Sequence, residues 1–236
     1  MAYSTDRKAF FDAVRRDPFG GSLTQGQVNG MNFLLDTWER HFAKQNPNDG
    51  TMWLSYALAT TYHESAATMR PIEEYGKGAG HSYGEPTGPY GQCYYGRGHV
   101  QLTWEENYIK GQDQLKPYGV NAPLHREPEL MLNDETSSLV LYDGMIDGWY
   151  TGVGLPKFFD ASKRLEDPVN ARKIVNGLDH AEEIARTYWS FKTAVETLSV
   201  PDVDKLDAEV VMETTTITIT APVGSKITVK MPPGVG

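Results

Sequence analysis

The chain has 236 residues, 39% of them hydrophobic, which suffices for one good core and a small appendage. Its 22 basic and 31 acidic residues give a net charge of −9, which excludes a nucleic-acid partner held by phosphate neutralisation. A single cysteine, Cys93, excludes internal disulfides. The polar first ten residues and the absence of a long apolar run predict synthesis in a cytoplasm without a signal peptide and without membrane insertion.

The first 70 residues read as three helices. Residues 8–14 carry a short apolar helical pattern. Thr24, with Gln27 three residues later, forms a capping-box pair that opens a second helix with apolar residues at three- and four-residue spacing. Residues 51–69 predict a third helix, whose composition indicates that it is largely buried.

Residues 71–98 change character, because they are rich in glycine and proline and too irregular for a helix. Long ordered loops of this kind usually line sites, and we expect a short hairpin around this one. Further helices are predicted over 105–114, 137–150, from Asp167-Pro168 through Ile174, and over 181–198. The predicted fold class is mainly α.

The C-terminal part differs in composition and in hydrophobic period. Residues 214–220 and 226–230 alternate apolar with polar side chains, which predicts two strands joined by a turn. The expected domains are 1–198, carrying the site, and 199–236, a linker plus a β segment. A lone hairpin is marginal in water, so we expect residues 207–236 to pack on the body, to form a homo-oligomer or to dock on a partner such as a virion protein. The alternative is a poorly ordered tail.

Glu64 is the strongest candidate for chemistry. It lies in a predicted helix that is otherwise apolar, and such surroundings disfavour a charged carboxylate, as a general acid requires. His63-Glu64 also begins like the zinc motif H-E-x-x-H, but Ala67 stands where the second histidine is needed. We therefore expect no metal site and no cofactor.

A glycosidase needs a second carboxylate. Pro71 ends the helical pattern, so the chain can turn back and bring Glu73 or Glu74 towards Glu64. Glu85, in the same loop, is a third candidate. The sequence alone does not decide which of these three residues is the second carboxylate.

The segment after the loop supplies polar groups. Arg97 lies between two glycines, where it can pair with the carboxylates. Gln101 and Thr103 share one face of an extended segment, and Asn107 follows. Amide and hydroxyl groups in a row suit sugar hydroxyls, N-acetyl groups or a positioned water.

Five motifs in this order resemble glycoside hydrolase family 19, which comprises plant-type chitinases and many phage or bacterial wall lysins. They are His63-Glu64-Ser65, Tyr95-Gly96-Arg97-Gly98-His99-Val100-Gln101-Leu102-Thr103, Asn107-Tyr108, Ile174-Val175-Asn176-Gly177-Leu178-Asp179 and Arg186. The resemblance covers residues 24–198, and residues 69–78 look like the phage and prophage branch.

The resemblance implies a lysozyme-like, mainly α fold and an inverting mechanism without metal or covalent intermediate. It implies that Glu64 is the general acid and that Thr103 holds the attacking water. The plant spacing of the two acids points near Glu85, and the phage spacing points to Glu73, which we prefer. The implied substrate-binding residues are Tyr95, Arg97, Gln101, Asn107, Asn176 and Arg186.

The expected function is cleavage of β-1,4 bonds in bacterial peptidoglycan by a phage or prophage lysin. Such a lysin acts on the cell wall after release or as part of a phage particle. One alternative is a chitinase acting on N-acetylglucosamine polymers. The other is a virion-associated, wall-binding component anchored by the C-terminal β segment.

Overall fold

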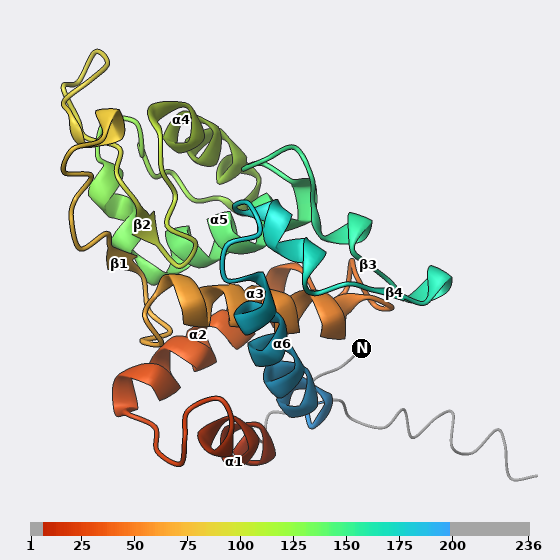
Figure 1. Ribbon diagram of the computed structural model, residues 1–236. Coiled ribbons are helices and arrows are strands. Elements are labelled where there is room, and N and C mark those ends of the chain that lie inside the picture. Colours follow the sequence, from red (N-terminus) through yellow and green to blue (C-terminus); the bar gives the residue numbers. More distant parts are fainter. Residues whose placement is uncertain (1–6, 199–236) are drawn as a thin grey trace, which may run out of the picture. The chain divides into compact units, whose positions relative to one another are not determined.

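The computed structural model describes residues 7–198, and the expected C-terminal β segment lies outside these residues. The described part is mainly α, as predicted (Figure 1). Its α-helices are α1 (Lys8–Arg16), α2 (Gln25–His41), α3 (Gly50–Glu64), α4 (Glu105–Gln114), α5 (Asp134–Asp147) and α6 (Ala181–Glu196). Its short 3-10 helices are η1 (Ser82–Gly84), η2 (Lys116–Tyr118), η3 (Pro128–Leu132), η4 (Leu155–Lys157), η5 (Ala161–Lys163) and η6 (Asn170–Ile174).

Two small antiparallel sheets complete the described part. Strand β1 (Ile72–Glu73) pairs with β2 (Arg97–Gly98), with Glu73 opposite Arg97. This pair confirms the short β structure expected around the long loop. Strand β3 (Phe159–Asp160) pairs with β4 (Leu165–Glu166), a pair that the sequence analysis did not predict.

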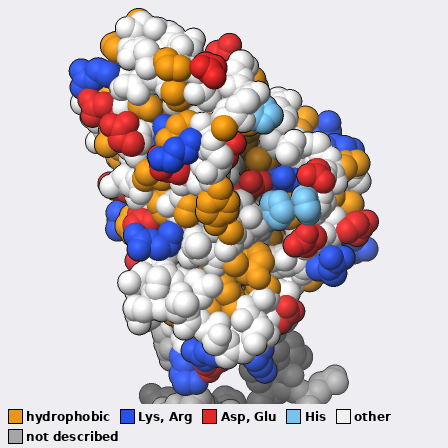
Figure 2. All heavy atoms as spheres, turned by 60° about the vertical axis from the view of Figure 1, so that its left-hand side comes forward, with side chains coloured by type: hydrophobic (Ala, Val, Ile, Leu, Met, Phe, Trp, Pro, Cys, Tyr) orange, Lys and Arg blue, Asp and Glu red, His pale blue; other side chains and the backbone are white. Residues whose placement is uncertain are grey.

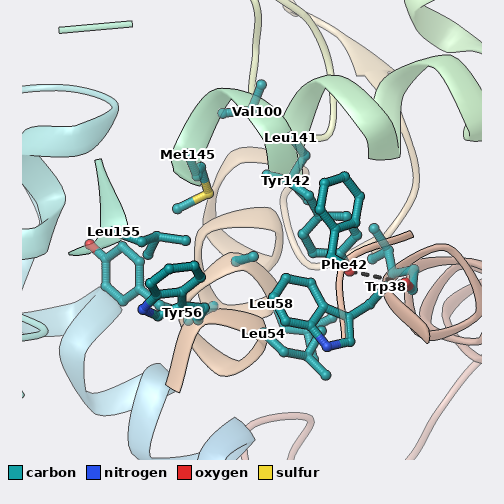
Figure 3. Close-up of a cluster of buried hydrophobic side chains, with 14 of the residues drawn as sticks. Trp38, Phe42, Leu54, Tyr56, Leu58, Val100, Leu141, Tyr142, Met145 and Leu155 are labelled. Atoms are coloured by element: carbon teal, nitrogen blue, oxygen red, sulfur yellow. Dashed lines mark hydrogen bonds between the residues drawn. The ribbon is translucent and has the colours of Figure 1, made fainter. Parts of the chain in front are cut away.

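Helix α3 is the centre of the fold, with α6 and α5 packed against it (Figure 1). Most of its residues are buried on every side, as expected for a helix with no polar stripe. Large aromatic and aliphatic side chains from α2, α3 and α5 meet there, each contributing about 1.5–3 kcal/mol by burial (Figure 3). Figure 3 labels the following side chains of these three helices and of the residue that caps α2: Trp38, Phe42, Leu54, Tyr56, Leu58, Leu141, Tyr142 and Met145.

Local sequence signals determine several helix ends as expected. The Thr24 side chain accepts the backbone N–H of Gln27, and the Gln27 side chain accepts that of Thr24, so the capping box is confirmed. Helix α4 has the predicted bounds. Helix α5 begins three residues earlier than predicted because Asn133 caps it, and it ends before Gly148, which has a φ of 71°.

The prediction for the third helix was wrong at its C-terminal end, because α3 stops at Glu64 and not at Met69. Ala66, Ala67 and Met69 have positive φ values, which break the helix. The Ser65 hydroxyl accepts the Met69 backbone N–H at 3.0 Å and closes this turn. A Cβ on Gly30 of α2 would lie 2.1 Å from the Met69 carbonyl oxygen, so only glycine lets the turn pass so close. Glu64 therefore stands at the end of α3.

The predicted helix from Asp167 through Ile174 is the shorter 3-10 helix η6, which begins at Asn170. The Asp167 carboxylate accepts the Asn170 backbone N–H at 3.1 Å and marks the start of this turn. Among the described residues, no helix is both long enough and apolar enough to cross a bilayer.

Candidate active site

Glu64 is held by an arginine from a distant segment. Arg172 of η6 donates from Nη1 to Glu64 Oε1 at 2.6 Å, and the two side chains are 4% and 15% exposed. The Arg172 Nε donates to the Asp179 carbonyl oxygen at 3.1 Å, which fixes the guanidinium on its other side. The Glu64 carboxylate is thus oriented by a residue 108 positions further along the chain.

Two opposing electrostatic effects act on this carboxyl group. The C-terminal end of the α3 dipole disfavours negative charge at Glu64. The Arg172 guanidinium stabilises that charge by a charge-assisted hydrogen bond. The predicted apolar setting of Glu64 was therefore incomplete, because a buried guanidinium lies beside its carboxyl group.

Glu64 lines a cleft of about 540 Å³ together with several of the predicted polar residues. The lining includes the carboxylate, amide and hydroxyl side chains of Glu64, Glu74, Gln101, Thr103, Asn107 and Asn176. They come from the end of α3, the segment after β1, the turn after β2, the start of α4 and the end of η6. Figure 2 shows a hollow on this part of the surface with acidic and basic side chains inside it.

The turn after β2 has a tightly constrained backbone. Gln101 has a φ of 52°, and its side-chain Nε2 donates to the carbonyl oxygens of Ile72 and Gly98, both at 3.1 Å. Gly98 has a φ of 88°, and a Cβ there would lie 2.6 Å from Ser137 Oγ. The Thr103 hydroxyl donates to the Gln101 carbonyl oxygen at 2.8 Å. Gln101 and Thr103 thus face the cleft because the whole turn is fixed by hydrogen bonds.

The three candidates for the second carboxylate lie in different places. Glu74 lines the cleft, and its Oε2 accepts the Gly96 backbone N–H at 3.1 Å. Glu73 is not in that lining, as expected for its neighbour in an extended segment. Glu85 is exposed at the end of η1 and also lies outside the lining. Of the three, the structure brings Glu74 to the cleft.

Glu73 instead belongs to a structural ion-pair network. It accepts a hydrogen bond from the Tyr95 hydroxyl at 2.8 Å, and Lys77 Nζ lies 2.9 Å from its other oxygen. Arg97 Nε lies 3.7 Å away. The hydrogen bonds from Lys77 and Tyr95 lower the pKa of Glu73, so this carboxylate stays charged.

Three residues predicted to bind substrate do not line the cleft. Arg97 is 5% exposed, with its guanidinium carbon 3.6 Å from the centre of the Tyr95 ring, so both residues support the wall from behind. Arg186 of α6 lines a different cavity, of about 750 Å³, between α1 and α6. That cavity is larger than the cleft but contains none of the other predicted residues.

Two cleft residues, Trp104 and Tyr83, and the arginine that contacts Glu64 escaped the sequence analysis as functional candidates. Arg172 carries no local signal because its partner is 108 residues away. Trp104 is 48% exposed and has a φ of 77°, and its ring lies edge-to-face with Tyr83 at 5.1 Å. Burial and the Glu74 carboxylate raise the pKa of Tyr83, so its hydroxyl stays protonated. The position of Trp104, directly after the motif that ends at Thr103, was a usable signal.

Among the described residues, one group of histidine and acidic side chains has its possible ligand atoms within 4.8 Å of one another, and it contains none of the residues that line the cleft.

The described fold is similar to that of solved structures. Chitinase C from Streptomyces griseus aligns with a TM-score of 0.50 and 21% identity, over 86% of this chain and 97% of that chain. A mutant of chitinase C aligns with the same score and coverage at 19% identity. A bacterial family 19 chitinase aligns with a TM-score of 0.46 and 21% identity, over 79% of this chain and 92% of that one, which is too weak to support an argument.

The chain therefore has the mainly α fold of chitinase C, in agreement with its sequence resemblance to glycoside hydrolase family 19. At these identities the likeness establishes the fold and not the activity. No protein-family model matches the chain. No curated protein matches its sequence.

Proposed function

We propose that this protein is a glycoside hydrolase that cleaves β-1,4 bonds between amino sugars with inversion. One observation carries the proposal: two carboxylates from separate segments, Glu64 and Glu74, line a single cleft together with amide and hydroxyl side chains. An inverting hydrolase needs an acid, a base and room for a water molecule between them. A cleft of about 540 Å³ has that room.

In this mechanism Glu64 protonates the glycosidic oxygen as the bond to the anomeric carbon breaks. A water molecule attacks that carbon from the opposite face and gives its proton to Glu74. The Thr103 hydroxyl accepts a hydrogen bond from this water, because its own proton is donated to the Gln101 carbonyl oxygen. Arg172 stabilises the Glu64 carboxylate once its proton has gone.

The remaining cleft residues bind the polymer. The side-chain amides of Asn107 and Asn176 suit hydroxyl and N-acetyl groups, which both donate and accept hydrogen bonds. Gln101 offers only its side-chain oxygen, as an acceptor, because its Nε2 donates to the Ile72 and Gly98 carbonyl oxygens. The exposed face of Trp104 offers an apolar surface for the C–H face of a sugar ring. No metal or covalent intermediate is required.

Peptidoglycan is the substrate that we favour, because residues 69–78 resemble the phage and prophage branch of the family. Chitin is the second candidate, since both similar structures are named chitinases and both polymers contain N-acetylglucosamine. We further propose that the enzyme reaches the wall after release or within a phage particle. Residues 207–236, outside the described residues, remain the proposed segment for oligomer or virion contacts.

The test is mass spectrometry of the soluble products from purified peptidoglycan and from chitin oligomers, with wild type and Glu64→Gln side by side. We expect wild-type products from peptidoglycan and a rate at least about 100-fold lower for Glu64→Gln, since the acid is lost while the shape is kept. Muramic acid at the new reducing end identifies a lysozyme, and glucosamine there identifies a glucosaminidase. Products from chitin alone establish the chitinase alternative. Products from neither polymer, or full activity of Glu64→Gln, refute the mechanism.

A further inference from the structure

Three side chains with metal-binding atoms converge beside the cleft. They are His63 near the end of α3, His180 at the N-cap of α6, and Glu183 in the first turn of α6. One ligand atom from each lies within 4.8 Å of the others, and the two imidazole rings are 4.9 Å apart. Figure 2 shows two neighbouring histidine side chains with acidic groups around them.

This donor set is the one that zinc and related transition metals prefer. Ligand atoms in a tetrahedral zinc site lie about 3.4 Å from one another, given zinc–ligand distances near 2.1 Å. The ligand atoms of the three side chains must therefore move closer together by shifts on the order of 1 Å to bind zinc. The His180 and Glu183 side chains are 50% and 57% exposed, so they have the freedom to move that far.

The surroundings also fit a bound cation. His180 Nδ1 lies 3.1 Å from Glu183 Oε2, and its Nε2 lies 3.5 Å from Asp179 Oδ2. A ligating histidine usually gives its other ring N–H to a carboxylate, which is the role that Asp179 would have. His63 and Glu183 line a cavity of about 160 Å³, large enough for water molecules to complete the coordination.

The local charge favours a cation as well. Glu183 and Asp179 are both negative and face His180. Arg172, a positive side chain that acts on His63, is paired with Glu64, so its charge is compensated.

We propose that His63, His180 and Glu183 form a binding site for a divalent transition metal, with Zn²⁺ as the best match. The sequence excluded the motif H-E-x-x-H at Ala67, but the fold brings the missing donors from α6 instead. A metal here would tie the end of α3 to the start of α6. It would thereby hold the turn that ends at His180, whose Asp179 carbonyl oxygen accepts a hydrogen bond from Arg172.

The test uses the full chain without an affinity tag, treated with a chelator and titrated with Zn²⁺ by calorimetry. We expect one tightly bound equivalent for the wild type. Affinity should fall at least about 10-fold for His180→Asn and for Glu183→Gln. Asparagine is chosen because it tolerates the left-handed backbone of His180, which has a φ of 58°.

The matched control is His41→Asn, which removes a partly buried histidine outside the cluster and should leave Zn²⁺ affinity unchanged. Zn²⁺ should also raise the Tm of the wild type and of the control, but not that of His180→Asn. Wild-type binding no tighter than that of His180→Asn, or equal loss in the control, overturns the proposal. Neither readout depends on hydrolysis, so failure here is distinct from failure of the proposed function.

Discussion

The two walls of the cleft position their side chains by different kinds of interaction. On one wall, Glu64 ends a buried helix and is held by Arg172, a partner from far along the chain. On the other wall, Glu74 and the segment up to Trp104 follow an irregular path with two-residue strands. There, backbone geometry does the positioning, since Gln101 and Trp104 both have positive φ values.

Because of this difference, we expect substitutions in the two walls to affect folding stability and turnover differently. The Glu64–Arg172 pair joins α3 to η6, so damage to it should affect the folding of the whole described part as well as catalysis. Glu74 makes its contact within the loop wall and is partly exposed, so its replacement should affect turnover while the fold survives. Four substitutions test the comparison.

The largest expected effect follows Glu74→Gln on the loop wall. Because it removes the proposed base without changing the side chain's shape, we expect kcat to fall about 10²–10⁴-fold, with the Tm nearly unchanged. Steady-state kinetics on the substrate identified above measure this, with the exposed Glu85→Gln as control. If Glu73→Gln is the variant that loses turnover, the second acid is Glu73, as the phage spacing suggested.

Arg172→Met tests the helical wall. It leaves a mostly buried Glu64 carboxylate without its partner, so the free energy of unfolding should fall by about 3 kcal/mol, and activity should fall too. Urea denaturation measures the first effect. Adding Glu64→Gln should recover part of the stability, because the uncompensated charge is then gone. The neighbouring exposed Lys173→Met should change stability by less than about 0.5 kcal/mol.

Gly98→Ala tests the loop wall through its backbone. Its φ of 88° and the 2.6 Å approach to Ser137 Oγ act together, so we expect a loss of about 2–4 kcal/mol. Gly119→Ala is the matched control, since Gly119 has a φ of 75° but open space around its Cα. It should lose only the conformational part, about 1–2 kcal/mol. Equal losses in thermal melts would show that the crowding at Gly98 is relieved.

The smallest effect concerns Glu73→Gln at different pH values. Its pKa is lowered in the folded state by Lys77 and Tyr95, so its contribution to stability is present above the unfolded pKa and is lost as the pH falls. We expect Glu73→Gln to lose at most about 1 kcal/mol at pH 7, and we expect this loss to shrink as the pH falls through the folded pKa. Unfolding curves over a series of acidic pH values measure this. A loss that stays constant over the whole series would mean that the carboxylate's charge is not the cause.

Local signals in the sequence were sufficient for much of the fold. The capping box at Thr24 and the bounds of α4 depend on neighbouring residues, and both were predicted. The early end of α3 was not, because its left-handed turn packs against Gly30, far away in the sequence. No pattern around Met69 reveals that contact.

The candidate site likewise has a part that was predicted from local sequence signals and a part that was not. Glu64, Gln101, Thr103 and Asn107 come from two recognisable motifs, and they do line one cleft. Which of Glu73 and Glu74 lines the cleft depends on a single residue of register, which the pairing of Glu73 with Arg97 determines. The pairing register of β1 and β2 cannot be predicted from the composition of the sequence or from the spacing of its motifs.

The Glu64–Arg172 pair also has a consequence for the order of events during synthesis. A chain grows from its N-terminus at about 5–20 residues per second, so the ribosome adds the arginine roughly 5–20 s after the glutamate that it will hold. Until then the acid has no partner and the cleft lacks the wall that η6 supplies. The cell that makes this protein therefore does not meet a finished cleft until most of the chain has been translated.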